Sequence, residues 1–179
     1  MTHLTPSALD RRSGSDRRQG IPGDPPEPGD GSTLLAPPFT LAPEMARARP
    51  GDPWVSVVAR SIEEYRAGRL DELVRTWDES LTWRVVADWP ARDHTGAVEV
   101  LAWHKAVHDE TRGTFRQEIV ALDASGGPIV VAHARTTARR GRRQLDVSSM
   151  LTFELVAMRV RRVTEIPGDP VEWDRFWTD

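Results

Sequence analysis

The chain has 179 residues, a formal net charge of −3 at pH 7 and no cysteine. The lack of cysteine excludes disulfide scaffolds, Cys-ligated zinc, iron–sulfur clusters and thiol nucleophiles. The charge balance argues against a nucleic-acid partner, because a protein that neutralises many phosphates carries a clear basic excess. The sequence has no long apolar run and no signal-peptide pattern, so we expect no membrane partner and a cytoplasmic location.

The beginning of the chain is rich in residues that break helices and strands. Residues 1–53 contain ten of the 14 Pro and six of the 13 Gly. Such a stretch buries too little apolar surface to offset the entropy of ordering it. All seven Trp lie later, beginning with Trp54. We therefore predict a disordered Pro/Gly-rich leader over 1–53, which includes a tandem Asp-Arg-Arg repeat, and one domain over 54–179.

The first half of this domain has helical spacing. Asp52 can cap a helix whose first residue is Pro53, and apolar residues recur at helical spacing until Gly68. A short second helix is predicted from Leu70 to Trp77. A strand over 81–87 and an irregular loop complete this half.

Gly96 begins a third predicted helix, which carries two histidines on its apolar side. His104 and His108 are four residues apart, a spacing that lets two imidazoles meet one metal ion. No third ligand is evident and Lys105 stands where zinc motifs carry Glu, so no metal or other cofactor is expected. His104 is then either a satisfied core residue or a proton carrier or polar anchor in a pocket.

The second half of the domain has the pattern of strands. Four β-branched runs with short turns between them predict antiparallel strands over 115–123, 129–139, 143–155 and 158–166. In the run 143–155 the odd-numbered residues, Ser149 and Leu151 among them, are predicted to face the core. Five Arg around Gly141 are interpreted as a solvated hairpin tip, because aromatic residues that could stack on bases are absent there.

A terminal helix or turn is predicted over 170–177. Helices followed by a meander of strands predict an α+β fold, with a curved antiparallel sheet packed on about three helices.

This order of elements resembles the nuclear transport factor 2-like superfamily, and within it the SnoaL-like and ketosteroid-isomerase-like branch. Four segments carry the resemblance: AGRLDEL at 67–73, GAVEVLAW at 96–103, RRQLDV at 142–147, and the ending DPVEWDRFW at 169–177. The resemblance implies a cone-shaped domain, usually a dimer, with a pocket between sheet and helices. Members include isomerases, cyclases, dehydratases, hydrolases and non-catalytic modules, so the fold alone selects no activity.

The resemblance also places a carboxylate base at Asp88, eight residues before Gly96. Such a base needs an apolar setting that raises its pKa. The second acid of ketosteroid isomerases falls on Ser149 or Met150, so ketosteroid isomerase chemistry itself is not expected.

We expect a cofactor-free domain, a homodimer by its resemblance, that binds a small apolar metabolite. As an enzyme it would use Asp88, assisted by His104, for isomerisation, cyclisation, dehydration or hydrolysis. The alternative is a non-catalytic interaction or assembly module whose cone is filled by tryptophan. The expected binding residues are Trp83, Trp103, His108, His133, Ser149 and Leu151.

Overall fold

The computed structural model describes residues 39–41, 51–90, 93–124 and 127–178. All of them belong to one compact unit, which spans Leu34–Asp179. The elements in chain order are β1 (Phe39–Leu41), α1 (Pro53–Arg66), α2 (Leu70–Arg75), β2 (Trp77–Val85), β3 (His94–Thr95), α3 (Ala97–Glu110), β4 (Arg116–Ala124), β5 (Ile129–Arg140), β6 (Arg143–Val156), β7 (Arg159–Pro167) and α4 (Pro170–Thr178).

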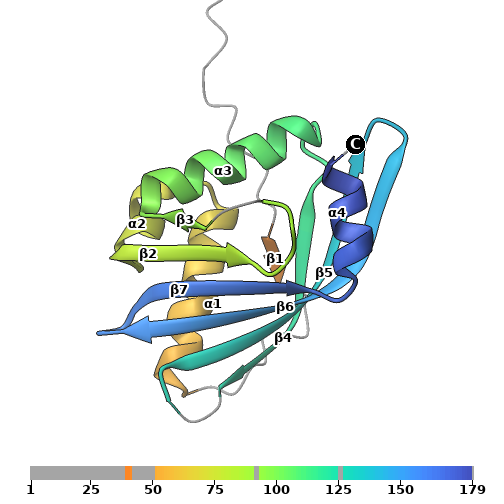
Figure 1. The fold of residues 1–179 in the computed structure, drawn as a ribbon. Helices are drawn as coiled ribbons and strands as arrows, with labels where there is room; N and C mark the ends of the chain where they lie inside the picture. Colours follow the sequence, from red (N-terminus) through yellow and green to blue (C-terminus); the bar gives the residue numbers. More distant parts are fainter. Residues whose placement is uncertain (1–38, 42–50, 91–92, 125–126, 179) are drawn as a thin grey trace, which may run out of the picture. The chain divides into compact units, whose positions relative to one another are not determined.

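The strands form one curved sheet in the order β1-β4-β5-β6-β7-β2-β3 (Figure 1). The neighbours β4 to β7 are antiparallel, as predicted, whereas β1 with β4 and β2 with β7 are parallel pairs. α1 crosses one face of the sheet, while α3 lies beside β2 and β3 and α4 lies beside β6 and β7. The predicted α+β class is confirmed, and the sheet is mixed in direction.

Local sequence signals explain several boundaries. The Asp52 carboxylate accepts hydrogen bonds from the backbone N–H groups of Trp54 and Val55, at 2.8 and 3.1 Å, and so caps α1. The predicted second helix is too long, because Trp77 begins β2. Trp77 pairs with Val160 of β7, and this strand pairing outweighs the helical spacing of the side chain.

The alternation predicted for β6 is confirmed. Its odd-numbered residues from Leu145 to Leu155, Ser149 and Leu151 included, are all buried. We call the face of the sheet that carries them the inner face. α1 and α2 pack on it, since Tyr65 and Leu73 share a cavity with Phe153 of β6 and Val163 of β7.

Most of the predicted leader lies outside the described residues. Within it, Phe39–Leu41 form β1, which pairs with β4 so that Phe39 is opposite Gln117 and Leu41 is opposite Ile119. Three residues are too few to show an alternation, so the sequence pattern carries no sign of this strand.

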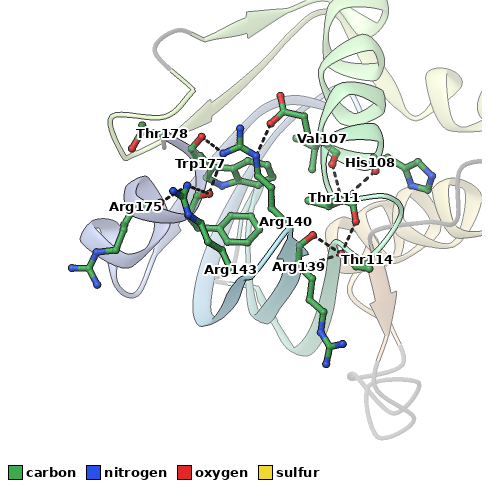
Figure 2. Close-up of polar contacts among 12 residues, drawn as sticks. Val107, His108, Thr111, Thr114, Arg139, Arg140, Arg143, Arg175, Trp177 and Thr178 are labelled. Atoms are coloured by element: carbon green, nitrogen blue, oxygen red, sulfur yellow. Dashed lines mark hydrogen bonds and ion pairs between the residues drawn. The ribbon is translucent and has the colours of Figure 1, made fainter.

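Two of the arginines assigned to a solvated hairpin tip instead hold the terminal helix (Figure 2). Arg143 donates to the backbone carbonyl of Arg175 at 3.3 Å, and Arg140 donates to those of Phe176 and Trp177. Arg140 also forms an ion pair with Glu110 at the end of α3, at 3.4 Å. Cations at the last carbonyls of α4 satisfy acceptors that have no partner within the helix.

The turn between β6 and β7 has an unusual composition. Ala157 and Met158 both adopt positive φ, 48° and 61°, the conformation that a type I′ hairpin turn requires. Asn-Gly or Asp-Gly is the favoured pair for such a turn, because other side chains are strained there.

Candidate functional site

A row of buried polar side chains crosses the inner face of the sheet. Four adjacent strands each contribute one: Gln117 on β4, Thr136 on β5, Ser149 on β6 and Glu165 on β7. Their exposed fractions are 1%, 0%, 4% and 1%. A carboxyl group in such a place needs hydrogen-bond partners, because burying it without them is costly.

The four side chains form a closed ring of hydrogen bonds. The side-chain amide of Gln117 donates to Glu165 Oε1 at 2.5 Å and to Thr136 Oγ1 at 3.3 Å. The hydroxyls of Thr136 and Ser149 are 3.0 Å apart. Ser149 closes the ring on the Glu165 carboxyl, and both Ser149 and the indole of Trp83 on β2 lower the pKa of that carboxyl.

Burial raises the pKa of Glu165 to about 7, while the hydrogen bonds from Gln117, Trp83 and Ser149 act in the opposite direction. Removal from water penalises the charged carboxylate, and donated hydrogen bonds favour it. Both the protonated and the ionised forms are therefore accessible near neutral pH, which is the condition for general acid–base catalysis.

Aromatic rings border this row. The Trp83 ring lies 4.8 Å from the His104 ring, and Tyr65 meets His104 edge-on at 5.4 Å. Burial, together with His94, lowers the pKa of His104 to about 3, and burial raises the pKa of Tyr65. His104 and Tyr65 are therefore neutral at physiological pH, and neither adds a charge beside Trp83.

A small cavity lies between α1, α2 and the inner face. Its walls are mostly apolar or aromatic, with Tyr65, Trp77, Trp83 and Phe153 among them, and Ser61 supplies a hydroxyl. Its volume is about 20 Å³, enough for about one water molecule. Any larger ligand must displace the side chains that line it.

The structure brings together several of the predicted site residues. Trp83, Trp103, His104, Ser149 and Leu151 are all buried. Trp83 contacts both Trp103 and His104, and Ser149 belongs to the polar ring. Their predicted roles in binding and catalysis stay predictions.

The remaining predicted residues lie elsewhere. Asp88 is exposed in the loop after β2, rather than in the apolar setting that a base needs, and its backbone N–H donates to Asp174 Oδ2 at 3.2 Å. His108 is half-buried, and a Cβ added at Gly113 would come within 2.9 Å of its ring. His133 is exposed, between buried Ala132 and Ala134, and so points away from the inner face.

Sequence reasoning missed Glu165, Gln117 and Thr136. The available signal is an acid at an inward position, since Glu165 follows buried Val163 by two residues. That signal is obscured because Arg161 and Arg162 are both exposed, which breaks the alternation along β7. The adjoining pairings with β6 and β2 also shift register.

The described residues contain no group of three or more His, Asp or Glu that could hold a metal ion. None of their helices is long and apolar enough to cross a membrane.

No protein-family model matches the sequence, and no curated protein matches it. Among solved structures, Bal32a from a soil-derived mobile gene cassette is 29% identical, with a TM-score of 0.65 over 70% of this chain and 96% of that one. A nuclear transport factor 2-like protein from Burkholderia pseudomallei is 15% identical, with a TM-score of 0.61 over 72% and 99%.

A protein from Shewanella denitrificans, assigned as a SnoaL-like polyketide cyclase, is 13% identical, with a TM-score of 0.53 over 69% of this chain and 95% of that one. At such identity the likeness concerns the fold and not the reaction. The helices, the curved sheet and these neighbours agree with the resemblance in the sequence, and the chain has the fold of the nuclear transport factor 2-like proteins.

Proposed function

We propose that this protein binds a small, largely apolar molecule at the inner face of its sheet, and that Glu165 transfers a proton to or from it. One observation carries the proposal: Glu165 is 1% exposed, its pKa is raised to about 7, and neutral donors surround its carboxyl. A group whose pKa is near the working pH is largely in the protonation state that catalysis requires and still has a sufficient driving force for proton transfer.

The neighbouring side chains suit this role. Gln117, Ser149 and Trp83 stabilise the carboxylate after it loses its proton, and they carry no charge themselves. Burial keeps water away from the carboxylate, which strengthens it as a base. Removal of a carbon-bound proton followed by its return to another atom needs no cofactor, so this chemistry matches an isomerase or cyclase type of reaction.

The test uses 5-nitrobenzisoxazole, a flat probe whose ring opens when a base removes one carbon-bound proton. The C–H electrons form the nitrile, the N–O bond breaks, and the phenolate product is followed by its absorbance. We expect turnover to rise with pH through about 7, as Glu165 ionises. Glu165→Gln should reduce turnover to the rate in buffer.

Two variants sharpen this test. Glu118→Gln changes an exposed acid on β4 and should leave the rate unchanged. Asp88→Asn examines the base predicted from the resemblance; loss of turnover in Asp88→Asn but not in Glu165→Gln would transfer the role to Asp88. Equal rates for the wild type and Glu165→Gln would refute the proposal.

The volume of the cavity favours a second candidate. At about 20 Å³ the cavity is far smaller than the several hundred Å³ of typical ligand pockets. This candidate is a non-catalytic module of the same fold, a homodimer that recruits a protein. It predicts no saturable binding of 8-anilinonaphthalene-1-sulfonate to the folded protein, whereas the ligand-binding proposal predicts saturation at one molecule per chain.

A further inference from the structure

We infer that Gln117 is a positioning residue for Glu165: its amide holds the carboxyl in its ionised form, and Thr136 fixes the direction in which that amide points. The inference rests on the proposed function for its catalytic meaning, but its geometry stands separately. Gln117 and Glu165 are 48 positions apart in the chain and come from β4 and β7.

The direction of each hydrogen bond follows from the groups involved. The Gln117 amide nitrogen has two hydrogens, one for Glu165 Oε1 and one for Thr136 Oγ1. Thr136, which accepts from Gln117, has its own hydrogen for Ser149 Oγ, 3.0 Å away. Ser149 then donates to Glu165. Every donor in the ring is therefore used, and the carboxylate only accepts.

The opposite direction of the amide suits only the protonated carboxyl. If the amide of Gln117 turned over, its oxygen would face Glu165 Oε1 at about the present 2.5 Å. Two acceptors at that separation repel each other unless a proton lies between them. The direction of the amide and the protonation of Glu165 are therefore coupled.

Thr136 decides between the two directions. Its hydroxyl accepts the second N–H of Gln117, and Thr136 is completely buried. Water therefore cannot replace Thr136 as the partner of this N–H. Replacing Thr136 by Val would leave that N–H without its partner while the amide faces the ionised carboxylate. The valine should therefore shift Glu165 toward its protonated form, and it should do so through Gln117.

Other titratable groups on the surrounding elements do not explain such an effect. Tyr65 of α1 and His104 of α3 lie near Trp83, and His94 of β3 stacks on Trp103. His94 also lies 3.6 Å from Glu99 of α3. The charged side chains next to the ring members in sequence are Arg116, which is half-buried, and Glu118 and Arg135, which are exposed. Arg84, next to Trp83, is also exposed. None of these residues changes in the variants tested.

The experiment is an infrared titration of the full chain between pH 4 and pH 9. A protonated carboxylic acid absorbs separately from a carboxylate, and Glu165→Gln identifies the band of Glu165. Gln117→Met, which keeps the side-chain length but loses the donors, should raise the midpoint of that band by about one pH unit, the effect of a charge-assisted hydrogen bond.

Thr136→Val should also raise the midpoint, by less, while Thr136→Ser should restore it. In the Gln117→Met background Thr136→Val should have no further effect, because it acts through the amide. An unchanged or lower midpoint in Gln117→Met would overturn the inference, and so would additive effects of the two substitutions. If Gln117→Met does not fold, the Val and Ser variants at Thr136 decide alone.

The same titration separates this inference from the proposed function. The infrared midpoint does not require turnover, so shifts as expected in a protein that turns over no probe would leave the inference standing and refute the catalysis. Turnover that depends on Glu165, together with a midpoint that Gln117→Met leaves unchanged, would support the catalysis and overturn the inference.

Discussion

Replacing Glu165 by Gln should change how the stability of this protein depends on pH. In the folded protein the pKa of Glu165 is about 7, above its ordinary value of 4.5. Below pH 4.5 both folded and unfolded chains hold the proton, and above it the unfolded chain releases the proton first. The free energy of unfolding should therefore fall as pH rises from about 4.5 to about 7, by about 3 kcal/mol. Gln does not titrate, so the variant should lack this loss.

His104 should have the opposite effect. Its pKa in the folded protein is about 3, below its ordinary value of 6.5, because it is buried and lies near His94. Its contribution is present above pH 6.5 and is lost as pH falls toward 3. Between about pH 4.5 and 6.5 the two contributions oppose each other, so the wild type should vary little through these two groups. His104→Gln should unmask the decline caused by Glu165, about 3 kcal/mol over this range.

The assay is urea unfolding followed by tryptophan fluorescence at pH 4.5, 5.5, 6.5 and 7.5. Comparing each variant with the wild type at every pH cancels the groups that they share. The advantage of Glu165→Gln over the wild type should grow by about 3 kcal/mol from pH 4.5 to 7.5, with unchanged denaturant dependence. Glu118→Gln, at an exposed position, is the matched control. A difference between Glu165→Gln and wild type that is the same at every pH would refute the reasoning.

Three further changes test the packing. Met158→Gly should raise the free energy of unfolding by about 1 kcal/mol, because Met158 is at φ 61°; urea unfolding measures it, and a loss of stability would contradict the strain. Arg140→Ala should speed amide hydrogen exchange in α4 and lower stability by about 1 kcal/mol, since Arg140 donates to the carbonyls of Phe176 and Trp177; exposed Arg142→Ala is its control, and equal exchange in both variants would count against it. Gly168→Ala should lower the melting temperature, because the new Cβ would lie 2.3 Å from Ser148 Oγ and 3.0 Å from its carbonyl oxygen, whereas a Cβ at Gly127 meets nothing within 4 Å; equal melting of the two alanine variants would rule out this clash.

Signals confined to neighbouring residues predicted the fold well. The cap at Asp52, the alternation along β6 and the buried end of α4 depend on contacts that the local pattern encodes. The N-terminal strand and the true start of β2 did not follow from the pattern, because each depends on pairing with a strand far along the chain.

The candidate site was harder to predict for the same reason. Trp83, His104 and Ser149 were identified from inward positions or from the resemblance, and all three are buried. The pKa of Glu165 depends on its burial and on the hydrogen bond from Gln117, 48 positions away, and no spacing rule relates residues on β4 and β7. Only the register of four strands brings these two side chains together.

The short strand β1 changes where the domain should be taken to begin. Phe39 is opposite Gln117, so the leader supplies the edge of the sheet beside the very residue that bonds to Glu165. A chain that begins at residue 52 would keep the four described helices, α1 to α4, but would leave part of the β4 edge without its neighbouring strand. An open edge invites pairing with another copy. Any self-association of such a shortened chain would then result from the missing strand. The oligomeric state of the protein should therefore be measured on a chain that retains Phe39–Leu41.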